Sequence, residues 1–252
     1  MDNAGATREG AVRRVLIAPD SFKGSCDAAQ VAAAISGGWR AVRPADELRA
    51  VPMADGGEGT AAAIAVATPG ARWHDAGEVR GPDGRPVPGR WLELPDGTAV
   101  VELAKVSGLP LMAEPDPLGA STAGLGMLLR RVLHAADPAR IVVAVGGSAS
   151  TDGGAGALAE LGLAVSTDAG APVPAGGAGL GVAAAVDASR LVAAPAGGVT
   201  VLVDVTAPLL GPSGAAAVFA PQKGAGPGQV AVLEAAMNRC CLLYTSDAAD
   251  ES

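Results

Sequence analysis

The sequence predicts an α/β fold in two domains: a parallel-sheet α/β/α domain, then a second α/β domain with a mixed sheet. Strand–loop–helix segments recur along the chain, which is typical of parallel strands joined by helices that cover the sheet. Within residues 71–103 the pattern changes to short strands separated by GPDG and PDG turns, which indicates hairpins. Aromatic residues make up only 2% of the chain, so the core must be aliphatic.

The first domain is predicted over residues 13–70. Residues 13–19 (RRVLIAP) have the pattern of a short buried strand. A helix is expected after Asp27, because Asp27 and Gln30 have the spacing of a capping box. A second strand is expected over residues 47–53, and the loop ADGGEG and a helix of sequence TAAAIAVA follow it.

The second domain is predicted over residues 71–238. It begins with the strands or hairpins of residues 71–103, and residues 168–181 are expected to form a loop because glycine, proline and alanine dominate them. The remaining predicted elements are a helix at about 119–136, a buried strand at 139–147, a helix at 157–162, a strand at 199–205 and a helix at 229–238.

Residues 239–252 (RCCLLYTSDAADES) differ from the rest of the chain in composition. They hold two of the three cysteines and the only tyrosine. We interpret this segment as a non-native tail, with a natural polar tail as the alternative.

Composition excludes several classes of protein. The net charge of −8 argues against nucleic-acid binding, which requires a basic face to neutralise phosphates. The N-terminal residues lack the apolar region of a secretory signal, and no apolar run reaches the roughly 18 residues of a membrane span. Three cysteines form neither a disulfide framework nor a paired zinc motif. A cytoplasmic protein without membrane or nucleic-acid partners is expected.

Two similar loops each follow a strand and open a helix: ADGGEG at residues 54–59 and STDGGAG at residues 150–156. Glycine allows close approach of a ligand, and a helix N-terminus offers N–H groups that suit phosphate or carboxylate. Asp55 and Asp152 have three candidate roles, which are capping the helix, holding Mg²⁺ and acting as a base.

The segment DSFKGS at residues 20–25 places a carboxylate, a hydroxyl and an ammonium group at the end of the first strand. Such a set suits a small hydroxy acid or a phosphoryl group, and the alternative is an ordinary glycine turn with a solvated lysine. Lys23, Lys105 and Lys223 are the only lysines in an arginine-rich chain, and each lies near glycine or serine. We therefore consider all three as candidate ligand contacts.

The absence of the common nucleotide-binding motifs excludes two classes of ATP-dependent enzyme. The chain has neither a GxxxxGK[ST] phosphate loop nor the HRD and DFG motifs of protein kinases. Two GxGxxA segments, beginning at Gly57 and at Gly154, loosely match the dinucleotide fingerprint. A Rossmann-type NAD(P)-dependent oxidoreductase is therefore one alternative function, and a non-enzymatic module that binds a small ligand is another.

Six blocks occur in order along the chain: IAPDSFKGS, VPMADGGEGT, VELAKVSGLPL, STAGLG, VGGSASTDGGAGALAELG and DVTAPLLGPSGAAAVFAPQKGA. Together they resemble the bacterial glycerate kinase family of the glyoxylate and glucarate pathways. The resemblance covers about residues 13–238 and implies ATP-dependent phosphorylation of D-glycerate to 2-phosphoglycerate, or alternatively 3-phosphoglycerate, with Mg²⁺. It also implies two α/β domains with the active site in the cleft between them. A homodimer is a candidate assembly.

The resemblance also implies roles for individual residues. Asp20, Lys23 and Asp55 are the catalytic candidates, and Asp55 and Glu58 are the candidate Mg²⁺ ligands. The candidate residues for binding substrate and phosphate are Ser21, Gly56, Gly57, Gly59, Gly147, Ser148, Asp152, Gly153, Gly154 and Lys223.

Members of the family continue well past the position of residue 238, with a further glycine-rich block and a GEGRxD-type motif. The resemblance therefore implies that the α/β/α domain is incomplete here and is completed by a missing C-terminal segment. Exposed apolar sheet edges and weak or absent activity of this chain are expected.

Overall fold

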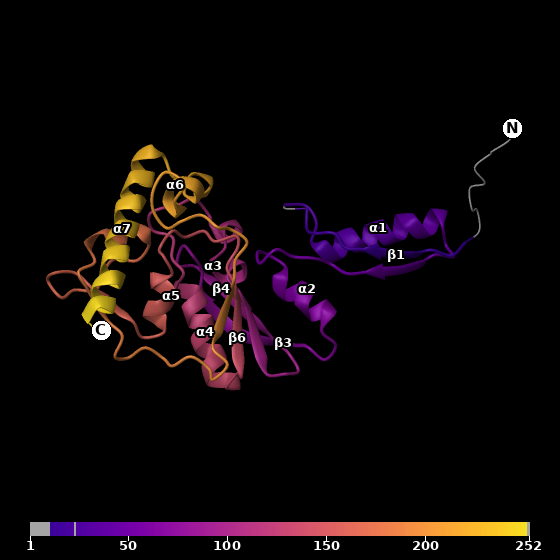
Figure 1. The fold of residues 1–252 in the computed structure, drawn as a ribbon, viewed down its shortest axis with the longest axis horizontal. Coiled ribbons are helices and arrows are strands. Elements are labelled where there is room, and N and C mark those ends of the chain that lie inside the picture. Colours follow the sequence, from indigo (N-terminus) through magenta and orange to yellow (C-terminus); the bar gives the residue numbers. More distant parts are fainter. Residues whose placement is uncertain (1–10, 23, 251–252) are drawn as a thin grey trace.

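The computed structural model describes residues 11–22 and 24–250, with side chains up to residue 243. It has a small first unit beside a larger second unit (Figure 1). The first unit contains β1 (Arg14–Ile17), α1 (Ala28–Val42) and β2 (Glu47–Ala50), and its two strands pair in parallel. The capping box is confirmed, because Asp27 accepts a hydrogen bond from the Gln30 N–H and Gln30 accepts one from the Asp27 N–H.

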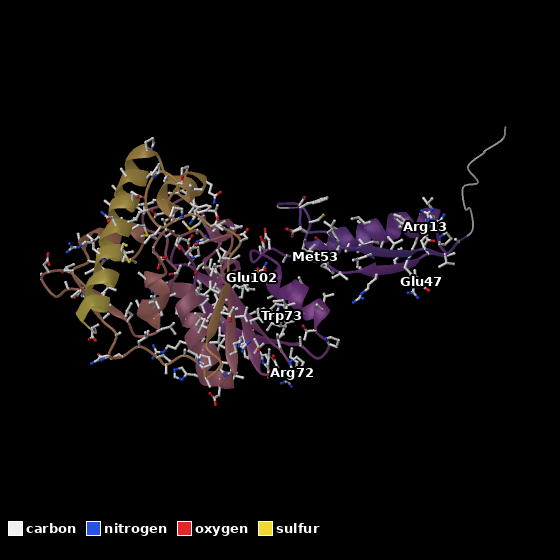
Figure 2. All side chains as sticks on the ribbon, viewed as in Figure 1. Arg13, Glu47, Met53, Arg72, Trp73 and Glu102 are labelled. Carbon is white, nitrogen blue, oxygen red and sulfur yellow. The ribbon has the colours of Figure 1, made fainter. Side chains whose placement is uncertain are left out.

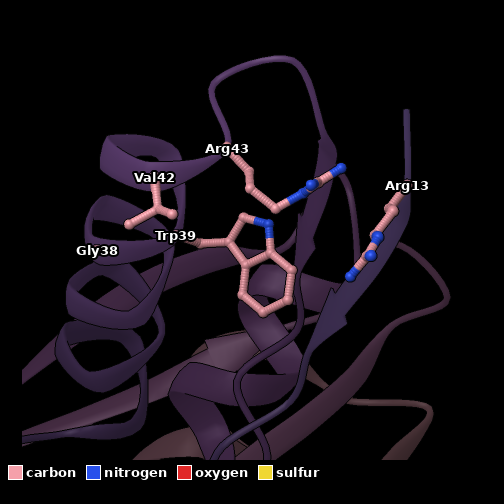
Figure 3. A pocket seen from close by; sticks show the side chains of 5 residues that line it. All are labelled: Arg13, Gly38, Trp39, Val42 and Arg43. Carbon is pink, nitrogen blue, oxygen red and sulfur yellow. The ribbon is translucent and has the colours of Figure 1, made fainter. Parts of the chain in front are cut away.

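The carboxyl ends of β1 and β2 point toward the larger unit. Figure 2 shows Arg13 and Glu47 at the far end of the first unit and Met53 at the end nearest the larger unit. At the far end, the buried Asp46 carboxylate accepts hydrogen bonds from Trp39 Nε1 (2.9 Å) and Arg43 Nε (2.7 Å). These bonds, the Arg43 bond first, hold the pKa of Asp46 well below its usual range. They tie α1 to the start of β2 beside a cavity of about 310 Å³ (Figure 3).

A five-stranded mixed sheet forms the centre of the larger unit, as the sequence predicts. The strand order is β3-β4-β5-β6-β9. The first three strands are antiparallel neighbours, whereas β5, β6 and β9 are parallel. The carboxyl ends of β3, β5, β6 and β9 therefore lie at one edge of the sheet. The strands are β3 (Arg72–Arg80), β4 (Pro86–Glu93), β5 (Thr98–Glu102), β6 (Arg140–Ala144) and β9 (Val199–Leu202).

Helices cover both faces of this sheet. On one face α4 (Ala123–Ala136) packs Leu128 and Val132 against strand residues such as Val101 and Ile141. On the other face α2 (Thr60–Ala67) packs Ala61 against Leu92 and Val100. The sequence assigns α2 to the domain of residues 13–70, but its packing joins it to the second unit. The domain ranges stay a prediction, and the packing favours a boundary before α2.

The remaining elements refine the predicted layout. The expected loop at 168–181 contains part of a 3₁₀ helix, and a small antiparallel hairpin of β7 and β8 flanks it. These elements are α3 (Ala104–Ser107), η1 (Leu109–Leu111), α5 (Ala155–Glu160), β7 (Ala164–Ser166), η2 (Gly177–Val182), β8 (Ala185–Asp187), α6 (Ala215–Phe219), η3 (Pro221–Lys223) and α7 (Pro227–Asp250).

The segment interpreted as a non-native tail continues the last helix. α7 runs through residues 239–250, and Arg239 Nε donates a 2.6 Å hydrogen bond to the Ala183 carbonyl. Cys240 packs beside the cluster of Leu180, Ala236 and Met237. The origin of the segment stays a prediction, because a helical contact does not distinguish native from foreign sequence.

Apolar side chains are exposed at both sheets. Leu16 of β1 is 64% exposed, and Val199 and Val201 of β9 are 49% and 53% exposed. Val199 and Val201 are register partners of Ile141 and Val143, so they extend the face that α4 covers over the neighbouring strands. Parallel strands are ordinarily covered on both faces, so these faces lack a cover here, and the expected exposure of apolar sheet edges stays a prediction.

Candidate functional site

The loop of residues 54–59 meets the segment that begins at residue 145, at the edge where β5, β6 and β9 end. The N–H of Gly146 donates a 3.1 Å hydrogen bond to the carbonyl of Gly56. A Cβ atom on Gly146 would lie 2.5 Å from Gly57 Cα, so only glycine permits this contact. The loop of residues 54–59 therefore lies directly against the loop that begins at residue 145. Both loops contain residues that the sequence nominates, among them Asp55, Gly56, Gly57, Gly147 and Ser148.

Glu102 is the residue at this edge to which the sequence gives no role. It ends the fully buried strand β5 and is itself only 4% exposed. Its two carboxylate oxygens accept hydrogen bonds from the N–H groups of Gly59 (2.8 Å) and Ala61 (3.2 Å). Burial raises the pKa of Glu102, and these two bonds oppose that shift. The one signal in the sequence that points to Glu102 is a charged residue directly after the apolar run Ala99–Val101.

This contact corrects an expectation from the sequence. The N-terminus of α2 does not offer free N–H groups to a ligand at Gly59 and Ala61, because the carboxylate of Glu102 already occupies them. Glycine at position 59 has φ +91°, a conformation that a glycine adopts without strain and that brings its N–H toward Glu102.

Asp152 plays the same part at α5. It is 2% exposed, and its Oδ2 accepts 2.8 Å hydrogen bonds from both the N–H and the hydroxyl of Thr122. Its Oδ1 accepts a 3.2 Å bond from the N–H of Gly154. Of the three roles open to Asp152, the geometry supports capping. Asp55 caps only its own loop, through a 3.2 Å bond from the N–H of Gly57, and its side chain is otherwise accessible.

Groups that are open to a ligand also lie around the neighbouring loop, in addition to the N–H of the exposed Glu58. The N–H groups of Gly147 and Ser148 have no acceptor among the described residues. Lys105, which the sequence nominates only as a candidate contact, lies one turn beyond Glu102. Its Nζ forms a 2.9 Å ion pair with Oε1 of Glu58, and both side chains are more than half exposed. We call Gly147, Ser148 and Lys105 the phosphate cradle, because backbone N–H groups and an ammonium group are the donors that phosphate requires.

A chain of hydrogen bonds leads from the cradle to Lys223. Ser148 Oγ and Ser150 Oγ lie 3.0 Å apart, and the ammonium of Lys223 donates to the carbonyl of Ser150. Lys223 is 8% exposed, and burial lowers its pKa to about 8, although the charge of Asp152 acts in the opposite direction. The structure thus places Lys223 behind the loop, inside the protein.

Asp20 and Ser21 lie at the carboxyl end of β1. The strand pairing continues past β1 and β2, because the N–H of Met53 donates to the carbonyl of Pro19 (2.9 Å). Asp20 and Ser21 therefore leave the first unit at the same end as the loop of residues 54–59. Oδ1 of Asp20 accepts a 2.6 Å bond from the N–H of Ser21. Lys23 lies outside the described residues.

The chain is therefore an α/β protein with open amides and a cation at the carboxyl edge of its sheet, which is the edge where such folds bind ligands. Residues 15–251 match the glycerate kinase family, so the chain belongs to this family.

The chain is similar to several named proteins. It is 40% identical over 225 residues both to the glycerate kinase of Bacillus subtilis (strain 168) and to the glycerate 2-kinase of Escherichia coli (strain K12). In each case the match covers 88% of this chain and 58% of the relative, so the chain spans little more than half of their length. A solved structure from Salmonella typhimurium LT2, assigned as glycerate kinase 2, matches with a TM-score of 0.79 and 39% identity. That match covers 94% of this chain and 64% of the other.

These findings do not support the oxidoreductase alternative. Its GxGxxA segments have their helix N–H groups bonded to Glu102 and Asp152, which leaves no helix N-terminus for a pyrophosphate. Within the described residues, no helix is both long and apolar enough to span a membrane.

Replacing Glu102 with glutamine tests its role as a cap. The glutamine NH₂ group would face the N–H of either Gly59 or Ala61, so one buried donor would lose its acceptor. We expect the free energy of unfolding to fall by about 1–3 kcal/mol, measured by urea denaturation. Glu58→Gln is the matched control, because Glu58 is exposed and its loss should cost less than about 1 kcal/mol. Equal stability of the two variants would contradict the assignment.

The lowered pKa of Lys223 predicts a pH dependence of stability. Above about pH 8 the folded protein releases this proton, whereas an unfolded lysine keeps it up to about pH 10. The unfolded state then binds more protons, so this lysine makes stability rise with pH across that window, by at most about 1.4 kcal/mol per unit. Below pH 8 the dependence disappears. Lys223→Met should flatten the profile between pH 8 and 10, and Lys105→Met should retain it; identical profiles for both variants would refute the prediction.

Proposed function

We propose that this protein phosphorylates D-glycerate with ATP as the phosphoryl donor. Membership of the glycerate kinase family supports the proposal, as do the names of the relatives from Bacillus subtilis and Escherichia coli. The observation that carries it is the contact between Gly146 and Gly56, which joins the two glycine-rich loops beside the phosphate cradle. The name of the Escherichia coli relative favours 2-phosphoglycerate as the product, with 3-phosphoglycerate as the alternative.

Phosphoryl transfer depends mainly on positioning and on neutralising charge. In the proposed reaction the N–H groups of Gly147 and Ser148 hold the phosphates of ATP, and the ammonium of Lys105 neutralises their charge. Lys223 supports the loop from behind through Ser150. The glycerate lies at the carboxyl end of β1, where Asp20 and Ser21 bind it, and Lys23 is a further candidate for binding it. The carboxylate of Asp20 or Asp55 accepts the proton of the attacking hydroxyl.

The residues at the site are compatible with Mg²⁺ carried by the nucleotide. No group of three or more His, Cys, Asp or Glu side chains is placed to hold a metal within the described part of the chain. Mg²⁺ ordinarily uses only one or two carboxylates together with substrate phosphates, and Asp55 and Glu58 supply such a pair. When bound, the ion would neutralise charge on the transferred phosphoryl group. Glu58 would then exchange its ion pair with Lys105 for the metal, which frees Lys105 for phosphate.

We also propose that the sheet of β1 and β2 is completed by further strands. Its exposed apolar residue Leu16 and its two-stranded size support this, because parallel sheets are ordinarily larger and covered on both faces. The relatives contain sequence beyond the matched region, and a segment of that kind would supply the strands. We also propose, as expected from the sequence, that the protein assembles as a homodimer and is located in the cytoplasm.

Phosphorus NMR of the purified chain with Mg-ATP and D-glycerate tests the activity. A new phosphomonoester signal, with coupling that identifies carbon 2, is the expected result. If no product forms, the same assay on a chain extended to the length of its relatives decides the matter, and absence of product there would refute the proposal.

Lys105→Met tests the cradle within that assay. Losing the ammonium should reduce kcat/KM by roughly 100-fold, because one charge-assisted contact to a phosphate contributes about 2–3 kcal/mol. Lys105→Arg should recover part of the activity, since it restores the charge. The matched control is Arg49→Met, which removes an exposed cation from β2 and should leave kcat/KM unchanged. Full activity of Lys105→Met would exclude Lys105 from the site.

A further inference from the structure

A second concave site lies on the α4 side of the sheet. It is a cavity of about 570 Å³, a volume within the range of small-molecule sites. Its walls come from the turn after β3, the start of α4, α5, and the hairpin region around β7. No role proposed so far uses this cavity.

The charges in the cavity disfavour an anion. Asp83, Asp116, Asp152 and Glu160 line it, and Arg80 is the one cation among the lining residues. Arg80 is already paired with Glu160, at 3.3 Å. Asp83 is paired with Arg85, and Asp152 is satisfied by Thr122 and Gly154, so a phosphate placed here would meet no unpaired cation among the lining residues, and a neutral group suits the cavity better. Hydroxyl groups on that occupant would find acceptors in the second carboxylate oxygens of Asp116 and Glu160, whose first oxygens bond to Gly119 and Arg80.

The opposite walls are apolar. Leu163, Val165 and Leu180 face the cavity together with Pro172 and Pro174. Flat surfaces made by prolines and aliphatic side chains suit a planar ring, because a ring gains contact area there without requiring a polar partner. The cavity therefore combines an apolar slot with acceptors for hydroxyl groups, which is the pattern of a nucleoside.

The cavity and the phosphate cradle share one edge of the sheet. Arg80 ends β3, and the cradle follows β6, three strands away, which corresponds to about 14 Å. The segment of residues 146–156 borders both sites, since Gly147 and Ser148 belong to the cradle and Asp152 and Gly156 line the cavity. The separation is comparable to the extended length of a ribose with its triphosphate.

We propose that this cavity binds the nucleoside part of the nucleotide whose phosphates lie in the cradle. This inference rests on the proposed kinase function and adds the place of the base and the ribose. The base packs between the prolines and the side chains of Val165 and Leu163, and the ribose hydroxyls donate to carboxylates at the other wall.

Calorimetric titration of the chain with adenosine, which carries no phosphate, tests the site. Val165→Trp fills the cavity and should weaken binding of adenosine at least tenfold. Val186→Trp is the matched control: Val186 is the cross-strand partner of Val165 in the same hairpin but does not line the cavity. Pyrophosphate binding should be unchanged in both variants. Equal adenosine affinity in the two variants, or no adenosine binding to the unchanged chain, would overturn the inference.

A measurement without any variant guards against misfolding of Val165→Trp. In the unchanged chain with labelled methyl groups, nuclear Overhauser effects should connect the adenine protons to Leu163 and Val165. Their absence at saturating adenosine would overturn the inference. Failure of this inference can be distinguished from failure of the proposed kinase function. If folded Val165→Trp phosphorylates glycerate with an unchanged KM for ATP, only the assignment of the nucleoside to this cavity is refuted. If adenosine binds in this cavity but the extended chain does not phosphorylate glycerate, only the proposed kinase function is refuted.

Discussion

The buried carboxylate of Glu102 is the constraint on which the arrangement of the site depends. It stands at the end of β5, in the centre of the mixed sheet, and its two oxygens hold the first N–H groups of α2. A buried carboxylate is stable only when its oxygens are hydrogen-bonded, and the α2 N-terminus provides those bonds together with a favourable dipole. This contact fixes α2 on the sheet and brings the loop of residues 54–59 against Gly146.

The second DGG loop repeats the same solution with a different carboxylate. Asp152 joins the start of α5 to Thr122, at the start of α4, and is as deeply buried as Glu102. The DGG motif therefore has the same structural role in both loops: it leads from a strand into a helix whose first N–H groups bond to a buried carboxylate. In the proposed function, ligand phosphates bind to open amides such as those of Gly147 and Ser148, and in the further inference the nucleoside takes the cavity of about 570 Å³.

The sequence predicts features that depend on neighbouring residues. The capping box follows from two residues three positions apart, and β6 follows from an uninterrupted apolar run. The contact between the loop of residues 54–59 and Gly146 does not follow from the topology of one sheet, because β2 and β6, which precede the two segments, belong to different sheets.

Features that depend on distant residues were not predictable in this way. Glu102 and Gly59 are 43 positions apart, and nothing local marks them as partners. The sequence TAAAIAVA is apolar on all sides, so it does not reveal which sheet α2 covers. The strands β7 and β8 have three residues each, too few for an alternating pattern to be recognised.

The central claim is that the chain's own carboxylates occupy the helix N-termini and that phosphate binds to the neighbouring loop. Titrating ¹⁵N-labelled protein with pyrophosphate tests it residue by residue. The account predicts large amide shifts for Gly147 and Ser148, and little change for Gly59 and Ala61, which stay bonded to Glu102. The opposite pattern, with Gly59 and Ala61 shifting and the amides of Gly147 and Ser148 unmoved, would contradict it.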